Sequence, residues 1–115
     1  LRFKSNRARG GFIRDIYIRN STIKTARFGI NMTLNYGANG PKDGDFPPVV
    51  RDIDIRDCVF ENVLKQAVFI SGADPEAQIT DVTIANCTFP ELKTPDTVTN
   101  ATRIRFIDNK TTQAK

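Results

Sequence analysis

The chain has 115 residues, and its mass of 12.9 kDa is enough for one domain or for part of a larger one, but not for two. Hydrophobic residues make up 39% of the sequence and charged residues 26%, which favours a globular chain, and no apolar run approaches the roughly 20 residues of a membrane-spanning helix. The net charge of +4 favours an anionic partner, while the absence of histidine excludes Ser-His and Cys-His catalysis and any histidine-ligated metal site within these residues.

The first predicted element is a short basic strand at residues 2–4. In an extended strand Arg2 and Lys4 project to one face and Phe3 to the other, so we expect two cations on the surface and one aromatic ring in the core. Two more arginines follow, and no carboxylate stands among the first eleven residues. We expect Arg7 to be a surface charge. Arg9 has two equal interpretations, because it either binds a ligand or pairs with a carboxylate of a neighbouring loop.

A repeated segment dominates the rest of the chain. It reads FIRDIYIRNSTI at 12–23, VVRDIDIRDCVF at 49–60 and QITDVTIANCTF at 78–89, and a weaker fourth copy begins at Thr102. Within each copy apolar and polar residues alternate, which predicts a strand with one buried face. Each strand then reaches a residue type that accepts a left-handed turn, namely Asn20, Asp57 or Asn86. Alternation at 26–36 and 65–72 predicts further short strands, and no segment has helical periodicity.

Short strands that recur with the same residue types in the same places predict an all-β fold, a parallel β-helix of about four coils. In that fold successive coils pair about 4.8 Å apart, so equivalent side chains stack in ladders. A small β-sandwich is the alternative, but it gives no reason for the ladder of turn residues. Three aspartates also repeat, and we interpret them as structural residues at the corners of the coil: Asp15, Asp52 and Asp81.

The position after each turn residue holds Ser21, Cys58 and Cys87 in successive copies. Cys58 and Cys87 are therefore expected to be stacked neighbours. Their spacing suits a disulfide, but parallel stacking seldom gives the torsion that a disulfide needs. We expect two buried free thiols that act as small apolar residues.

The opening LRFKSNRARGG, taken with the repeat, resembles the last third of the polygalacturonases of glycoside hydrolase family 28. Arg2-Phe3-Lys4 is similar to the R-x-K motif of that family, and Tyr36 stands where the family has a substrate-contacting tyrosine. The longer form of the motif in bacterial and exo-acting members, R-x-K-(S/T)-N-x-x-R-G-G, is matched by Arg2, Lys4, Ser5, Asn6, Arg9, Gly10 and Gly11. The resemblance implies a right-handed β-helix in a secreted or periplasmic enzyme that hydrolyses α-1,4-galacturonosyl bonds of pectin with inversion.

The catalytic segments of that family are missing from this chain. The family's three catalytic aspartates lie in an N-T-D segment and a D-D pair, supported by a G-H-G segment, and the sequence contains none of these. The resemblance therefore implies that residues 1–115 are one β-helix segment of a longer catalytic domain and are inactive alone. We expect upstream coils or another chain to cover the N-terminal edge of the solenoid, since solenoids need capping repeats.

The resemblance and the chemistry of the residues together give five candidate substrate-binding residues: Arg2, Lys4, Asn6, Arg9 and Tyr36. An arginine fork holds a carboxylate bidentately, lysine adds a point charge, and tyrosine offers a ring face and a hydroxyl. Asn6 either donates to a sugar hydroxyl or caps the turn, and Gly10-Gly11 allows a tight bend.

The expected partner is therefore an acidic polysaccharide such as galacturonan. We expect no nucleic acid, membrane, metal or cofactor, because the basic cluster lacks interleaved aromatics and two cysteines are too few for a zinc cluster. The alternative function is a non-catalytic β-helix module that binds acidic polysaccharide, of the adhesin or tail-fibre type. The choice between exo and endo action is left open.

Overall fold

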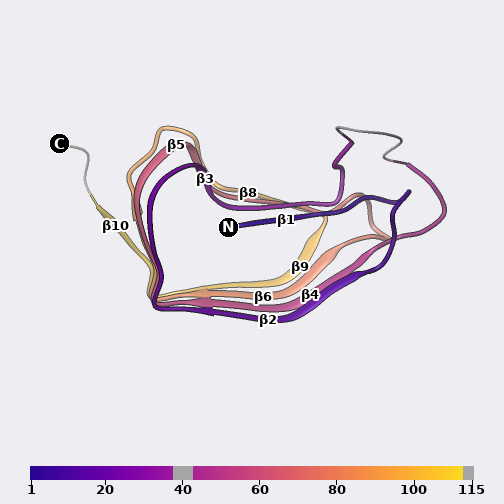
Figure 1. Ribbon diagram of the computed structural model, residues 1–115, viewed down its shortest axis with the longest axis horizontal. Helices are drawn as coiled ribbons and strands as arrows, with labels where there is room; N and C mark the ends of the chain where they lie inside the picture. The colour runs from indigo at the N-terminus through magenta and orange to yellow at the C-terminus, as the bar shows by residue number, and fades with distance from the viewer. Residues whose placement is uncertain (38–42, 113–115) are drawn as a thin grey trace.

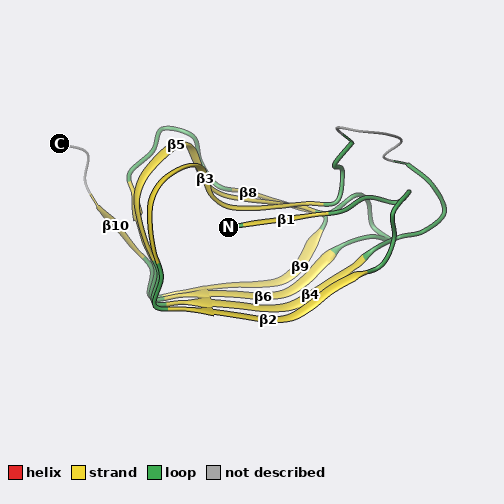
Figure 2. Cartoon of the chain, in the orientation of Figure 1, coloured by secondary structure: helices red, strands yellow, loops and turns green. Residues whose placement is uncertain are grey.

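The computed structural model describes residues 1–37 and 43–112. These residues form strands and no helix, so they include no helix long and apolar enough to cross a membrane (Figure 2). The strands are β1 Arg2–Lys4, β2 Phe12–Arg19, β3 Thr22–Thr33, β4 Val49–Arg56, β5 Val59–Ser71, β6 Ile79–Ala85, β7 Thr88–Pro90, β8 Thr97–Thr99, β9 Ala101–Ile107 and β10 Lys110–Thr112. The expected all-β class is confirmed.

Two parallel sheets make up the architecture. One has the strand order β2-β4-β6-β9, and the other has β1-β3-β5-β7-β10 with β8 beside β5. Each strand pairs in parallel with its counterpart in the next copy of the repeat and not with its neighbour in sequence. Figure 1 looks down the shortest axis, and the equivalent strands of successive coils overlap in this view. The chain is therefore a parallel β-helix with four coils, as expected, and the β-sandwich alternative is wrong.

The core is a stack of aliphatic side chains between the two sheets. Ile18, Ile55, Ile84 and Phe106 occupy one ladder position in four successive strands. The two inner members, Ile55 and Ile84, are fully buried, whereas Ile18 is half-buried and Phe106 is 45% exposed. Both ends of the apolar stack are therefore open in this chain, because the outer coils have a neighbour on one side only.

The turn ladder has the backbone that the sequence predicts. The residues that end the first strand of each coil have left-handed φ angles of 51°, 57°, 50° and 52°, and they are Asn20, Asp57, Asn86 and Asp108. Asparagine and aspartate tolerate this conformation because their short side chains bond locally. The repeat thus follows from a backbone requirement at one position per coil.

The three repeated aspartates have a different place from the one expected. They are left-handed, with φ near 57°, but they lie inside β2, β4 and β6, where the ladder skips one residue. They mark a bend within a strand and not a corner between strands. The fourth coil has Arg103 at this position, and its guanidinium donates to both carboxylate oxygens of Asp81 at 2.6 and 2.8 Å. These hydrogen bonds lower the pKa of the Asp81 carboxyl.

The second strand of each of the first two coils is longer than the sequence indicated. Residues expected to form separate short strands are joined in β3 and β5, and a bulge between Ala26 and Phe28 bends the pair. Because a bulge lets a strand turn without ending, an alternating pattern interrupted once still belongs to one strand.

Cys58 and Cys87 are both buried and free, which confirms the expectation. Each thiol donates to a backbone carbonyl two residues earlier, that of Arg56 at 3.3 Å and that of Ala85 at 3.4 Å. Burial raises the pKa of the Cys87 thiol. The two buried cysteines therefore serve as small core residues.

Because the ends of the apolar stack are open, an isoleucine-to-alanine substitution should destabilise the fold by different amounts at two positions of the same ladder. Ile55→Ala leaves a cavity between two coils and should lower the free energy of unfolding by about 2–5 kcal/mol. Ile18→Ala removes the same atoms from a half-buried position and should cost distinctly less. Urea denaturation of both variants measures the difference, and equal losses would contradict the picture of an open end.

Candidate functional site

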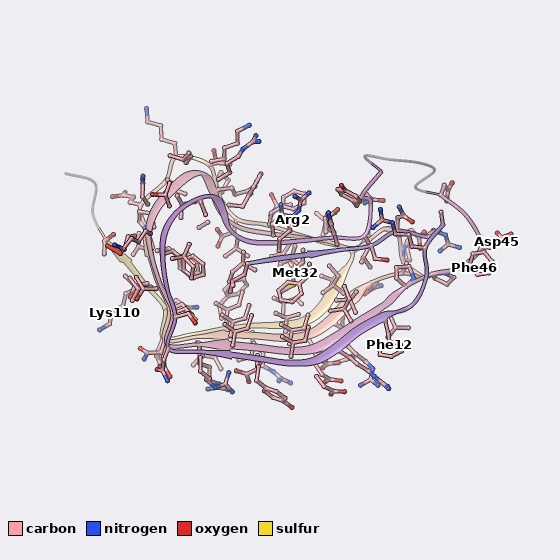
Figure 3. The ribbon with its side chains drawn as sticks, viewed as in Figure 1. Arg2, Phe12, Met32, Asp45, Phe46 and Lys110 are labelled. Carbon is pink, nitrogen blue, oxygen red and sulfur yellow. The ribbon has the colours of Figure 1, made fainter. Side chains whose placement is uncertain are left out.

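The basic face begins on the edge strand β1. Its residues pair with β3 in the register Arg2 with Asn31, Phe3 with Met32 and Lys4 with Thr33. Phe3 packs partly buried against the core, while Arg2 and Lys4 are exposed, as the alternation predicts. Figure 3 shows Met32 between the two sheets and Arg2 on the other side of the same sheet. The two cations therefore lie on the outer surface.

Tyr36 lies at the centre of the basic face. The Arg2 and Arg9 guanidinium carbons lie 5.3 and 5.0 Å from the centroid of its ring, and the Lys4 ammonium nitrogen lies 4.1 Å from it. All three are within the roughly 6 Å over which a cation interacts with an aromatic face. We call these four residues the cation cluster. Tyr36 is 30-odd residues from β1 in sequence, so the coil is what brings the cluster together.

The positive charge of the cation cluster is not compensated nearby. Within residues 1–37 and 43–112 no carboxylate forms an ion pair with Arg2, Lys4 or Arg9. Of the two interpretations of Arg9, pairing with a neighbouring carboxylate therefore has no support in the described residues. The ring of Tyr36 partly offsets the mutual repulsion, because its face carries the negative part of its quadrupole.

Asn6 holds the turn that carries Arg9. Its side chain is 1% exposed, and its Oδ1 accepts from the backbone N–H groups of Ala8 at 3.0 Å and Arg9 at 2.8 Å. Its Nδ2 donates to the carbonyl of Tyr36. Of the two roles that the sequence left open, this geometry favours the turn cap, and it joins the backbones of two cluster residues.

The two glycines after the turn are left-handed, with φ of 65° at Gly10 and 76° at Gly11. A Cβ on Gly10 would lie 2.9 Å from the Cβ of Phe46, whereas nothing lies within 4 Å of one on Gly11. The turn also accepts a backbone hydrogen bond at the carbonyl of Arg7 from the N–H of Phe46, at 2.9 Å. Residues 5–11 are therefore packed against the segment around Phe46.

The expectation that Arg7 is a surface charge is wrong. Its side chain is 18% exposed, and it forms ion pairs with Asp43, Asp74 and Glu76. These carboxylates come from two loops far along the chain, so no pattern of neighbouring residues predicts that Arg7 pairs with them. The one sign in the sequence is that Arg7 is a basic residue close to the motif but not part of it.

The cation cluster can bind an anion but contains no acid or base suited to cutting a sugar bond. Arginine and lysine are protonated donors, and a carboxylate is the ligand that they suit. The described residues contain no group of three or more His, Cys, Asp or Glu side chains placed to hold a metal ion.

One of the comparisons with known proteins finds a similar protein. In an alignment of 90 positions that covers 76% of this chain, the sequence is 38% identical to a probable polygalacturonase of Vitis vinifera. The match spans 18% of that protein, so the chain corresponds to less than a fifth of its length. No family model matches the chain. No solved structure matches it either.

The two glycines give a matched pair of substitutions. Gly11→Ala should cost about 1 kcal/mol, the usual penalty of a left-handed non-glycine residue. Gly10→Ala should cost more, because the methyl group also meets Phe46. Thermal unfolding of the two variants compares them. Equal costs would mean that the turn is not packed against Phe46.

Proposed function

We propose that this chain, which is polygalacturonase-like over 76% of its length, is the C-terminal, substrate-binding part of a pectin-degrading glycoside hydrolase. The enzyme hydrolyses α-1,4-galacturonosyl bonds with inversion. The observation that carries the proposal is the uncompensated cation cluster of Arg2, Lys4 and Arg9 around Tyr36. Galacturonan has one carboxylate on every sugar, so it offers the charge that this surface lacks.

The free energy of binding comes from relief of repulsion as well as from new contacts. Three cations held near one ring repel one another, and a carboxylate placed among them replaces repulsion by attraction. An arginine fork donates two parallel hydrogen bonds to the two carboxylate oxygens in one plane, and the lysine ammonium adds a mobile charge. Because the cluster is exposed, salt weakens the binding.

In this proposal the catalytic carboxyl groups belong to a longer chain. An inverting glycosidase needs a carboxylic acid and a carboxylate about 6.5–9.5 Å apart. The sequence has no N-T-D, D-D or G-H-G segment, so we place these groups upstream of Leu1. The coils that carry them would cover the half-buried edge of β2, where Ile13, Ile16 and Ile18 lie. The whole protein then works outside the cell, where pectin is found.

The long R-x-K-S-N-x-x-R-G-G form of the motif favours an enzyme of the bacterial and exo-acting type. We therefore propose release of sugars from the chain end. Product analysis of the whole enzyme tests this, since exo action yields short products from the start, whereas a broad range of oligomers would contradict it.

Trigalacturonate is the probe that tests binding by the chain. Arg2→Ala and Lys4→Ala should each weaken it about tenfold or more, as expected for loss of a hydrogen bond between charged groups. Isothermal titration calorimetry measures the dissociation constants. Lys65→Ala is the matched control, since it removes one charge from an exposed site on β5 and should leave the affinity unchanged. Unchanged affinity in the Arg2 and Lys4 variants would contradict the proposed site.

The position in a longer enzyme has its own test. The chain alone should release no reducing ends from polygalacturonate, and the gene should encode N-T-D and D-D segments in frame before Leu1. Hydrolysis by the chain alone would contradict the proposal. An upstream frame without those segments would also contradict it and would favour a non-catalytic polysaccharide-binding module.

A further inference from the structure

We propose that Arg7 is a positioning residue that keeps Arg9 over the ring of Tyr36. It does so by fastening the turn at residues 5–11 to two loops of later coils. Arg7 matches no position of the basic motif, and within residues 1–37 and 43–112 no ion pair, side-chain hydrogen bond or cation–π contact joins its side chain to the cation cluster. The consequence for ligand affinity rests on the proposed function, but the consequence for the position of Arg9 does not.

The guanidinium of Arg7 reaches both loops at once. Its Nε donates to the backbone carbonyl of Gly44 at 2.8 Å, and its Nη1 donates to Asp74 Oδ2 at 3.2 Å. Asp43 and Glu76 lie farther off, at 3.8 and 3.9 Å, and their side chains are 93% and 80% exposed. The contacts with Gly44 and Asp74 are therefore the stronger pair, because exposed ion pairs contribute little.

Asp74 is a fixed anchor for this contact. Its Oδ1 accepts from the backbone N–H groups of Glu76 at 2.8 Å and Ala77 at 3.0 Å, so it caps a tight turn. The N–H of Ala73 closes the same turn on the carbonyl of Ala77 at 2.9 Å. One carboxylate oxygen thus holds the loop and the other holds Arg7, so a movement of Arg7 would disturb both.

The backbone of Arg7 is held as firmly as its side chain. Its carbonyl accepts from Phe46, and a Cβ on Gly44 would lie 3.1 Å from that carbonyl oxygen. The preceding residue, Asn6, bonds the N–H of Arg9. Arg7 therefore lies between the cap of the turn and the residue that the turn presents.

Arg9 needs such support because its neighbours repel it. Arg2 and Lys4 lie around the same ring, and no described carboxylate pairs with Arg9. An unrestrained turn would let the Arg9 side chain move towards water and away from the two other cations. The charge of Arg7 is paired with Asp74, its nearest carboxylate, outside the cluster. A lysine would replace it only in part, because one ammonium has no planar fork with which to reach two loops.

The position of Arg9 can be read without a ligand. The sequence has no tryptophan and two tyrosines, so Tyr17→Phe leaves Tyr36 as the single tyrosine reporter. In this background Arg9→Ala should shift the Tyr36 ring-proton resonances, and Arg7→Gln should produce a shift in the same direction. In the Arg7→Gln background, Arg9→Ala should then add little. Unchanged Tyr36 resonances in Arg7→Gln would overturn the proposal.

A matched control separates positioning from general loss of stability. Arg103→Gln removes another arginine with two close hydrogen bonds to one carboxylate, in the other sheet, and should leave the Tyr36 resonances unchanged. Equal shifts in Arg103→Gln and Arg7→Gln would overturn the proposal. Should Arg7→Gln fail to fold, Asp74→Asn removes the charge that holds Arg7 and keeps an oxygen to cap the turn. It should shift Tyr36 as well, and no shift would overturn the proposal.

Trigalacturonate binding gives the second arm. Arg7→Gln should weaken binding about five- to tenfold, and Arg7→Lys should weaken it less than that. Adding Arg9→Ala to the Arg7→Gln chain should weaken binding by less than about twofold more, because the two residues act as a unit. Effects of Arg7→Gln and Arg9→Ala that simply multiply would overturn the coupling. If the unaltered chain does not bind trigalacturonate, the proposed function fails, and the Tyr36 resonances still decide the role of Arg7.

Discussion

Parallel hydrogen bonding between successive coils is the interaction on which the rest of this structure depends. It places Ile18 on Ile55 and Ile55 on Ile84, so the apolar stack exists only in this register. A slip of one residue would turn each isoleucine towards water. The left-handed turn residues, one per coil, keep the strands in register, because each of them ends its strand at the equivalent ladder position. The same register puts Arg2 and Lys4 outside and Phe3 inside, so the candidate site is a product of the coil.

The cation cluster shows what a solenoid surface offers a charged polymer. Tyr36 belongs to the coil after β1, and the turn capped by Asn6 brings Arg9 to the same ring. The packing of the turn holds the three cations together against their mutual repulsion, because no described carboxylate forms an ion pair with any of them. Such a surface is prepared for an anion before the anion arrives, which lowers the cost of ordering the side chains on binding.

The sequence predicts those features that depend on neighbouring residues in one strand or turn. The alternation around Ile53 and Ile55, the turn at Asp57 and the outward placement of Arg2 all follow from rules that act over a few residues. The partial burial of Arg7 does not, because its partners come from loops whose length varies between copies of the repeat. Asp52 was expected in a structural role, but its bend inside a strand is visible only in the skipped register of the ladder.

In the proposed function, the cation cluster binds the carboxylates of a galacturonate chain. The most direct measurement is a titration of the isotope-labelled chain with trigalacturonate, followed by amide and side-chain resonances. We expect shifts concentrated at residues 2–9 and 35–36, strongest at the Tyr36 ring, and we expect them to be lost with the methyl-esterified trimer. Shifts that are centred on the outer face of the β2-β4-β6-β9 sheet, or that persist with the uncharged ester, would contradict it.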